Sequence, residues 1–438
     1  MKHIKPILKN MPAKVIGFLK TIKSSPEKVY ELYLIKTQPL LHRRALKRLK
    51  QKDVPLNVVF FAIFKSVWKY DKLYWLLEKD PRFHPIVLVC PAVNYGREEM
   101  LRTLYECYSD FKERGYCVIC SYDEQKNVYV DARSLSPDII FYTNPYKGLI
   151  DNRYYITHFR DVLTCYVNYG YSVVKHQWGN ALLFHKILWR HFCECEGIYQ
   201  FIVSLRKETC FNCVISGYPA YDDFLEVDYC EKDWKQPDSN LKRIIWAPHH
   251  TIEETNIEAM IRFSNFFQYA DFMQEMAVKY ADKIQIVFKP HPLLRHKLYK
   301  HPEWGIEKTD RYFGFWENCG NTNYVSGDYR NLFKSSDAMI HDCGSFTMEY
   351  LYLQKPVMYI SGYNHQSQLN KVALQAYNCH YIAKNRDDVE YFIVNTVIGG
   401  NDPMCNKRKA FYDAVLTPPN SKTVAENMFD SIVTAIFD

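Results

Sequence analysis

From residue 86 onward, short runs of β-branched and aromatic residues alternate with stretches of helical periodicity. Such alternation is typical of parallel sheets whose strands are joined by crossover helices. In the first half the pattern predicts helices at residues 98–113 and 181–193, and strands at residues 86–90, 117–121, 138–142, 163–167, 201–204 and 214–216. These elements predict an α/β fold with doubly wound sheets.

The pattern starts again after a polar stretch at residues 231–240. It predicts a long helix through Phe263 and Tyr280, and strands at residues 243–247, 284–288, 338–340 and 357–360. Single cores seldom grow beyond about 250–300 residues, so 438 residues favour two domains. We expect a helical extension at 1–80, Rossmann-like domains at 81–235 and 236–400, and a helical segment at 401–438 that packs back on the first domain. The cleft facing both domains is the expected site.

Positive charge is concentrated at the amino end of the chain. Residues 1–52 contain 14 Lys or Arg and two Glu, a balance of +12, which leaves −5 for the remainder. A basic arm on a near-neutral body suits an anionic surface, either lipid headgroups or nucleic acid. Apolar residues at helical spacing between 7 and 22 would let this arm lie flat on a membrane. Leu41, Ala45 and Leu49 mark one face of a second helix, and an ordinary face packed on the body explains that pattern equally well.

Two further observations concern the compartment and metals. The most apolar stretch, residues 58–68, is interrupted by Lys65 and is shorter than the roughly 20 residues that cross a bilayer. With 14 cysteines and no signal peptide, we expect reduced thiols in a cytoplasmic protein on the inner face of the cell membrane. The pairs Cys117/Cys120 and Cys210/Cys213 overlap strand-like runs, where residues three apart face opposite ways, so buried thiols are favoured over zinc. No Walker A motif or paired aspartates appear, and we expect no metal and no cofactor.

The first candidate site follows the predicted strand at 284–288. Lys289, Pro290, His291 and Pro292 come in succession there, with Arg295 shortly after. Proline fixes its own φ and restricts the residue before it, so this loop holds His291 in a defined place at the end of the strand. A phosphate contact fits these residues. The alternative is a turn histidine that is hydrogen-bonded to the backbone.

The second candidate site is a strand, tight turn, helix and strand at residues 336–360, in which His341 and Asp342 precede Gly344 and Ser345. Gly344 allows the backbone to approach a ligand closely, and the amides at a helix start beside Ser345 favour phosphate oxygens. Glu349 follows one helical turn later and could accept hydrogen bonds from ribose hydroxyls. An ordinary capped helix with an exposed Glu349 is the alternative.

Three other histidines are candidates. His176 precedes an apolar helix, and a neutral imidazole there could take the proton of an acceptor hydroxyl near pH 7. His249 and His250 follow Ala247 and Pro248 at the end of the strand at 243–247, so they are expected in the cleft. Their role is open, and lone histidines are commonly structural.

The order of these segments resembles one family. The segment that contains Gly217, Tyr218, Pro219 and Asp222 is similar to a Gly-Tyr-Pro-Arg-x-Asp motif. The pairs at 247–248 and 291–292 are similar to an Ala-Pro and a His-Pro motif, residues 68–71 to Trp-x-Tyr-Asp, and residues 336–345 to a Ser-Asp strand followed by Thr-Asp-Tyr-Ser-Ser. Over residues 58–360 the chain thus resembles the CDP-glycerol glycerophosphotransferases of teichoic-acid-type polymer synthesis, which have the GT-B architecture.

The resemblance implies a transferase that moves glycerol phosphate, or a related alditol phosphate, from a CDP-linked donor to a hydroxyl of a lipid-linked or polymeric acceptor in teichoic acid or capsule polysaccharide synthesis. It implies that His176 is the base and that Glu349 holds the ribose. His291, the Ser345 turn and Lys289 would neutralise charge on the diphosphate. The departures are His341 to Ser345 in place of Thr-Asp-Tyr-Ser-Ser, Glu349 in place of Asp, and a Trp-His-Gly-Thr segment of which only His176 remains. They leave the donor alditol or sugar open.

Two other functions compete with this reading. A UDP-sugar glycosyltransferase or a UDP-N-acetylglucosamine 2-epimerase of the same architecture has a hallmark similar to Gly344 and Ser345 followed by Glu349, but an epimerase needs no basic arm. A nucleic-acid-binding protein would use the arm, yet aromatic residues are not interleaved with its basic clusters.

Overall fold

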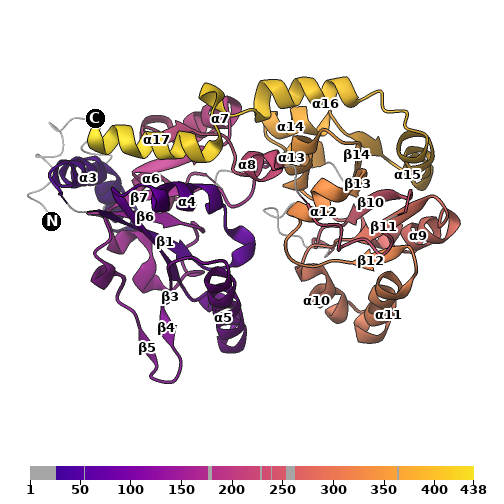
Figure 1. The fold of residues 1–438 in the computed structure, drawn as a ribbon, viewed down its shortest axis with the longest axis horizontal. Helices are drawn as coiled ribbons and strands as arrows, with labels where there is room; N and C mark the ends of the chain where they lie inside the picture. The colour runs from indigo at the N-terminus through magenta and orange to yellow at the C-terminus, as the bar shows by residue number, and fades with distance from the viewer. Residues whose placement is uncertain are drawn as a thin grey trace, which may run out of the picture.

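The computed structural model describes residues 26–53, 55–175, 180–226, 229–237, 239–252, 262–362 and 365–438. Two lobes lie side by side, and each is built around a parallel sheet (Figure 1). The strand order is β3-β2-β1-β6-β7-β8-β9 in the first lobe and β12-β11-β10-β13-β14-β15 in the second. Both orders run outward in opposite directions from a first strand, which is the doubly wound Rossmann topology. The fold expected from the sequence is confirmed.

The strands have the following bounds. The first sheet contains β1 (Leu56–Ala62), β2 (Phe83–Val89), β3 (Val118–Cys120), β6 (Ile139–Tyr142), β7 (Leu163–Val167), β8 (Arg190–Cys193) and β9 (Cys213–Ile215), with a small hairpin of β4 (Tyr122–Asp123) and β5 (Val128–Tyr129) outside it. The second contains β10 (Lys242–Ala247), β11 (Ile284–Phe288), β12 (Thr322–Tyr324), β13 (Ala338–His341), β14 (Val357–Ile360) and β15 (Tyr381–Ala383).

The helices connect these strands. In the first lobe they are α3 (Pro26–Leu49), α4 (Asp71–Lys79), α5 (Arg97–Glu113), α6 (Leu183–Ile187), α7 (Glu196–Arg206) and α8 (Ala220–Leu225). The rest are α9 (Phe266–Lys279), α10 (Leu293–Lys300), α11 (Gly305–Asn318), α12 (Arg330–Ser335), α13 (Phe346–Glu349), α14 (Lys371–Tyr377), α15 (Arg386–Tyr391), α16 (Cys405–Phe411) and α17 (Val424–Phe437).

Two predicted elements are wrong. The strand predicted at 201–204 lies inside α7, whose buried side chains Ile198, Ile202 and Arg206 recur at the four-residue spacing of a helix face. The helix predicted at 181–193 is confined to α6, and its second half is β8. A short apolar run is compatible with either structure, because periodicity cannot separate the two over so few residues.

The first sheet begins earlier in the chain than the boundary at residue 81 implied. Strand β1 pairs with both β2 and β6 and therefore lies within the sheet. Its alternate side chains enter opposite cores: Val58 and Phe60 pack on the side of α4 and α5, and Val59 and Phe61 pack on the other side. Burial on both faces explains why residues 56–62 form a nearly continuous apolar run.

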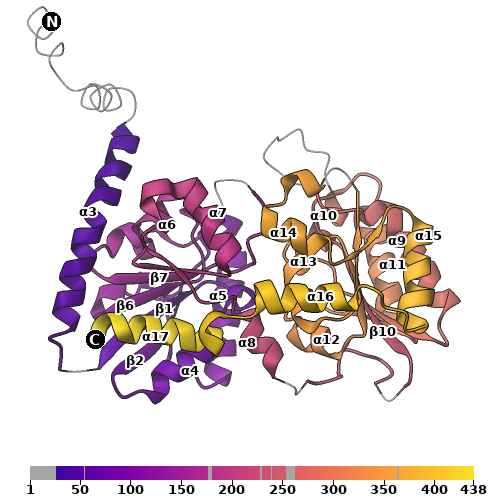
Figure 2. The ribbon, with the colours of Figure 1, turned by 90° about the horizontal axis from the view of Figure 1, so that it is seen from above.

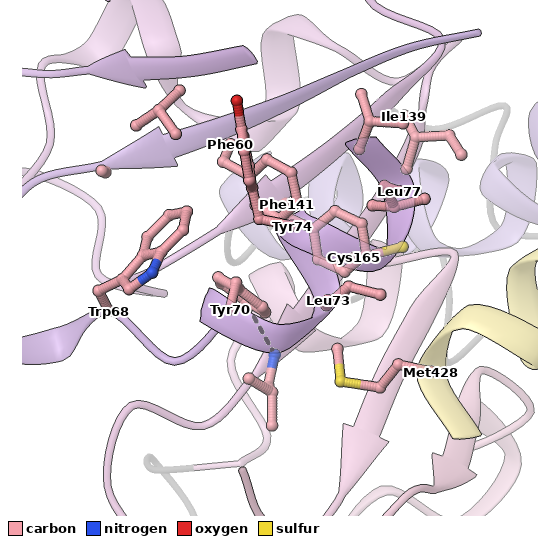
Figure 3. Packing of buried hydrophobic residues seen from close by; sticks show 14 of the residues in the cluster. Phe60, Trp68, Tyr70, Leu73, Tyr74, Leu77, Ile139, Phe141, Cys165 and Met428 are labelled. Atoms are coloured by element: carbon pink, nitrogen blue, oxygen red, sulfur yellow. Dashed lines mark hydrogen bonds between the residues drawn. The ribbon is translucent and has the colours of Figure 1, made fainter. Parts of the chain in front are cut away.

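The C-terminal helix α17 returns to the first lobe, where it lies beside α4 (Figures 1 and 2). Its Met428 packs among Leu73, Leu77 and Cys165 of the first core (Figure 3). The two carboxylate oxygens of Asp222 in α8 accept the backbone N–H groups of Val424 and Ala425, each at 2.8 Å. Asp222 therefore caps α17 from a neighbouring helix and fixes the direction of its return.

Helix α3 packs along the first lobe and buries Leu34, Gln38, His42, Ala45 and Leu49. The face marked by Ala45 and Leu49 in the sequence is thus packed on the body. Residues 1–25, with the first amphipathic pattern, lie outside the described residues. In the described part of the chain, no helix has the length and apolar character needed to span a membrane.

Candidate functional site

A cavity of about 640 Å³ lies where the two lobes meet. Its lining follows the carboxyl ends of strands from both sheets, as expected for doubly wound domains. The first lobe contributes Lys69, Tyr146, Asn168, Tyr169, Tyr171 and Ser172, and the second contributes His249, His250, Lys289, His291, Gly344, Ser345 and Glu349. The structure therefore brings together most of the second-lobe residues that the sequence singled out.

His291 is fixed by the backbone around it. Its N–H donates to the carbonyl of Pro248 at 3.0 Å, and its own carbonyl accepts the N–H of Leu294 at 2.8 Å. The backbone N–H of Leu293 donates to Nδ1 of the ring at 3.2 Å. A backbone N–H can only donate, so Nδ1 is the acceptor and the proton of the neutral ring is on Nε2. Burial, with the charges of His250 and Lys289, lowers the pKa of His291 to about 3.

His249 has the same tautomer for a different reason. The Oγ1 atom of Thr251 accepts the N–H groups of Phe263 at 2.8 Å and of Ser264 at 3.3 Å. With both lone pairs used, its hydroxyl proton goes to Nδ1 of His249, 3.0 Å away. Burial, then His250 and His291, hold the pKa of His249 well below its ordinary value. Two neutral rings thus carry Nε2–H donors, and their centroids lie 5.1 Å apart.

The three rings of His249, His250 and His291 also have nitrogen atoms within 4.8 Å of one another, close enough to consider a metal. A metal binds the lone pair of an imidazole nitrogen. At Nε2 of His291 this would move the ring proton to Nδ1, where it would face the N–H of Leu293. These contacts fit an anion that accepts N–H donors better than they fit a cation.

A second group of possible ligands, His191, Cys193 and Cys213, lies inside the first lobe. There the guanidinium of the buried Arg206 donates to Nδ1 of His191, which places a positive charge against that ring and disfavours a cation beside it. Cys210, the partner of Cys213 in the sequence pair, instead donates its thiol to the carbonyl of Lys207 at 2.9 Å. Neither group therefore has the contacts of a metal centre in the described residues.

The turn after β13 closes the cavity on the side of the second lobe. A Cβ atom at Gly344 would lie 3.2 Å from Phe263 and 3.3 Å from Val173, which comes from the first lobe. Any side chain there would press on the contact between the lobes. Ser345 precedes α13, and its side chain makes no capping hydrogen bond to the helix. Ser345 lines the cavity.

Asp342 and His341 support this turn and do not line the cavity. The carboxylate of Asp342 accepts the backbone N–H groups of His249 and Asn265, each at 2.6 Å. Its burial raises its pKa to about 7. His341 is fully buried, and its Nδ1 accepts the N–H of Cys343 at 3.2 Å. Ala247, the last residue of β10, and Pro248 do not line the cavity either: their carbonyls accept the thiol of Cys343 at 3.1 Å and the N–H of His291 at 3.0 Å.

Glu349 is buried, with 2% of its surface exposed, so the alternative of an exposed glutamate is excluded. One carboxylate oxygen accepts the hydroxyl of Tyr218 at 3.4 Å, and the other accepts the hydroxyl of Tyr329. Lys69 of the first lobe contacts the same hydroxyl of Tyr329 at 3.2 Å. Burial raises the pKa of Glu349, and the charge of Lys69 opposes that rise. Glu349 therefore lies at a polar junction between the lobes.

Three other predicted residues have separate outcomes. Lys289 lines the cavity and is 4% exposed, and its burial lowers its pKa. Arg295 is not among the lining residues: it pairs with Asp310 at 2.8 Å and packs over Phe313. His176 lies outside the described residues, and its role as a base stays a prediction. The segment before it crosses to the second lobe, where the N–H of Lys175 donates to the carbonyl of Gln368 at 3.0 Å.

Residues 204–368 match the family model of CDP-Glycerol:Poly(glycerophosphate) glycerophosphotransferase. This part of the chain is similar to that family. The matched segment contains every second-lobe candidate, including His249, His291, Ser345 and Glu349. The resemblance seen in the sequence is confirmed. No curated protein sequence gives a significant match to the chain.

Solved structures extend the likeness from residues 204–368 to both lobes. The wall teichoic acid polymerase TagF is 14% identical, with a TM-score of 0.54 over 94% of this chain and 98% of its own. S. aureus MnaA in complex with UDP is 14% identical, with a TM-score of 0.52 over 86% and 96%. The UDP-GlcNAc 2-epimerase of Neisseria meningitidis bound to UDP-GlcNAc is 11% identical, with a TM-score of 0.54 over 87% and 100%. At these identities the likeness establishes the two-domain GT-B fold.

Sequence reasoning missed the tyrosines of the cavity. Tyr146 and Tyr169 follow β6 and β7 directly, so their position after two predicted strands was a usable signal. Tyr329 follows the short strand β12, which the sequence did not reveal. Lys69 lies in the segment that resembles Trp-x-Tyr-Asp, and the structure places this segment at the junction with Glu349.

Proposed function

We propose that this protein transfers glycerol phosphate, or a related alditol phosphate, from a CDP-linked donor to a hydroxyl of a lipid-linked or polymeric acceptor. The observation that carries the proposal is the match of residues 204–368 to the glycerophosphotransferase family. The cavity supports it, because the same segment presents two Nε2–H donors, a buried lysine and the Ser345 turn to one space. These are groups that bind a diphosphate.

In the proposed reaction, the acceptor oxygen attacks the β-phosphorus of the donor. A new bond forms between oxygen and phosphorus, the bond from the β-phosphorus to the bridging oxygen breaks, and CMP leaves with that oxygen. The acceptor proton passes to a base, for which His176 is the candidate. His291, His249 and Lys289 stabilise charge on the non-bridging oxygens. Glu349, held by Tyr218 and Tyr329, orients the ribose.

The identity of the nucleotide donor distinguishes this function from that of a UDP-sugar enzyme. Purified protein is incubated with CDP-glycerol or with UDP-N-acetylglucosamine and an acceptor extract, and released CMP, UMP and UDP are measured. We expect CMP from CDP-glycerol, with loss of release in His291→Ala and retention in the control Arg295→Ala, whose guanidinium pairs with Asp310 outside the cavity. Release of UDP, or epimerisation of the UDP-sugar, would instead favour a nucleotide-sugar enzyme like those that share the fold.

We further propose a cytoplasmic location on the inner face of the membrane. Residues 1–25 carry six lysines and no acidic residue. On α3, Tyr30 and Tyr33 are each 57% exposed and Leu40 is 49% exposed, and the spacing of these residues puts them on one side of the helix, with Arg44 beyond them. Tyrosines beside basic residues suit the interface of an anionic bilayer.

Vesicle sedimentation tests this location. We expect binding to vesicles of phosphatidylcholine with phosphatidylglycerol and little binding to phosphatidylcholine alone. Deletion of residues 1–25, or Tyr30→Ser with Tyr33→Ser, should weaken it. The cut is placed at residue 25 because α3 buries Leu34 and Leu49 against the body. Equal binding after the deletion refutes the role of the arm, and preference for RNA over vesicles would favour the nucleic-acid reading.

A further inference from the structure

The wall of the cavity that comes from the first lobe has a composition of its own. We call Tyr146, Asn168, Tyr169, Tyr171, Ser172 and Asn180 the tyrosine wall, because all six line the cavity and lie after β6 and β7. The hydroxyls of Tyr146 and Tyr169 are 3.4 Å apart, and their rings meet edge to face. Burial raises the pKa of Tyr169, so its hydroxyl is neutral at physiological pH. The wall therefore offers ring faces and uncharged hydroxyls.

The amides of this wall are held by a buried glutamate. One oxygen of Glu194 accepts the side-chain amide of Asn168 at 2.9 Å and the backbone N–H of Ser172 at 3.0 Å. The amides of Asn168 and Asn180 donate to the hydroxyl of Ser172 at 2.8 and 3.2 Å. Because Glu194 is only 2% exposed, it acts on the cavity through these neighbours. Short polar side chains that are fixed in this way can bind a polar ligand without first becoming ordered.

The wall lacks free positive charge. Among the residues that the structure describes, Lys69 is the only cation that the first lobe contributes to the lining. Its ammonium contacts Tyr329, lies 5.6 Å from the ring centres of both Tyr218 and Tyr329, and opposes the rise in the pKa of Glu349. The charge of Lys69 is therefore directed at the second lobe, on the donor side.

An acceptor that ends in glycerol phosphate carries an anion next to its reactive hydroxyl, and proteins bind such phosphates with arginine, lysine or clustered N–H donors. The tyrosine wall has instead the groups that suit a sugar ring. The apolar C–H face of a pyranose packs on an aromatic ring, and its hydroxyls pair with tyrosine, serine and asparagine. The opposite wall comes from the second lobe. It presents Lys289 and the Nε2–H groups of His249 and His291, which suit the phosphates of the donor.

We propose that the tyrosine wall binds the acceptor and that the acceptor unit is an uncharged carbohydrate, not a glycerol phosphate. The inference rests on the proposed function, since it names the acceptor class of that reaction. It has a consequence for the reaction sequence. The product ends in glycerol phosphate, which the wall does not fit, so each acceptor receives one unit. A glycosyl transfer must then restore a sugar end before the next addition.

Binding alone tests the acceptor class, independently of turnover. Saturation-transfer NMR on the full chain compares methyl glycosides of glucose, galactose and N-acetylglucosamine with sn-glycerol 3-phosphate and a synthetic glycerol phosphate trimer. We expect at least one glycoside to bind. Tyr169→Ala should weaken it by roughly tenfold, the loss of one packed ring. Tyr105→Ala, on the exposed side of α5, is the matched control and should leave glycoside binding unchanged.

The phenylalanine variants separate ring from hydroxyl and guard against misfolding. Tyr146→Phe with Tyr169→Phe keeps both rings, and we expect it to keep part of the glycoside affinity that Tyr169→Ala loses. Calorimetry with CDP-glycerol should give the same Kd for all these variants. Because this measures donor binding alone, a failure of the proposed function is distinguished from a failure of the acceptor proposal. Binding of the glycerol phosphate trimer without any glycoside, or unchanged glycoside binding in Tyr169→Ala, overturns the proposal, as does the absence of all glycoside binding.

Discussion

The backbone N–H of Leu293 donates to Nδ1 of His291 at 3.2 Å, and this contact determines what the imidazole offers to the cavity. With Nδ1 used as an acceptor, the neutral ring has its proton on Nε2. Burial lowers the pKa of His291 to about 3, so the ring stays a neutral N–H donor at physiological pH. A neutral N–H group binds a diphosphate oxygen through a hydrogen bond, whose strength depends on its orientation. The flanking prolines restrict the backbone and so hold the imidazole in a defined orientation.

His291→Ala should therefore weaken binding of the nucleotide donor without unfolding the protein. Loss of a hydrogen bond to a charged group is worth about 1.5–3 kcal/mol, or roughly 10- to 150-fold in Kd. Calorimetry with CDP-glycerol measures the effect, and Arg295→Ala in the first turn of α10 serves as the control. Equal donor affinity in His291→Ala and wild type would remove His291 from the donor site.

The same tautomers predict the response to metals. We expect activity to persist after exhaustive treatment with EDTA, and added Zn²⁺ to bind weakly, because Nε2 of His249 and of His291 carries a proton. Two-bond ¹H–¹⁵N NMR spectra on labelled protein should show both rings as neutral Nε2–H tautomers from about pH 5 to 9. Loss of activity on chelation, with recovery on adding a divalent ion, would show that these rings hold a metal.

For His176 the prediction comes from the sequence, since the residue lies outside the described part of the chain. A general base contributes roughly 100- to 10,000-fold to a rate, so His176→Ala should lower kcat by that order. The Kd for CDP-glycerol should remain near that of wild type, because the second lobe supplies the donor contacts. A variant with full kcat would exclude His176 as the base.

Asp222 gives a prediction for stability and pH. Asp222→Ala leaves the first two N–H groups of α17 without their acceptor, although the Thr423 cap remains, and should lower the free energy of unfolding by about 1–2 kcal/mol, measured by urea unfolding. Burial raises the pKa of Asp222 from 3.8 to about 6, against the opposing effect of the Ala425 and Val424 amides. The part of the stability that depends on protonation of Asp222 is therefore complete below about pH 3.8 and is lost as the pH rises through about 6, whereas the hydrogen bonds from Val424 and Ala425 remain. Asp222→Asn should flatten this pH dependence, and an unchanged slope would contradict the account.

The sequence predicted the fold well because a parallel sheet buried on both faces leaves long apolar runs. The runs at 163–167, 284–288 and 357–360 coincide with β7, β11 and β14. The prediction failed at residues 201–204, where three consecutive apolar residues lie within α7 and only Ile202 among them is buried. The predicted first domain also began too late, at residue 81, because β1 was assigned to the basic helical extension that precedes it.

Some residues of the candidate site could be predicted from strand order, and others depend on packing between distant segments. Residues that directly follow a strand, such as His291 and Ser345, were found because the topology alone brings them to the cleft. Arg295 was misplaced, because which side of α10 faces outward depends on packing against Asp310 and Phe313 in α11. The junction of Lys69, Tyr218, Tyr329 and Glu349 joins distant segments, so no local pattern could reveal it.

The central claim is that the bond broken joins the β-phosphorus of the donor to the bridging oxygen, and isotopic labelling tests it most directly. CDP-glycerol labelled with ³²P on the β-phosphorus is incubated with protein and acceptor, and the products are separated. We predict that the label moves to the acceptor product and that the released nucleotide is unlabelled CMP. Label that stays with the nucleotide as CDP would contradict the account, because the bond to glycerol would then have been the one to break.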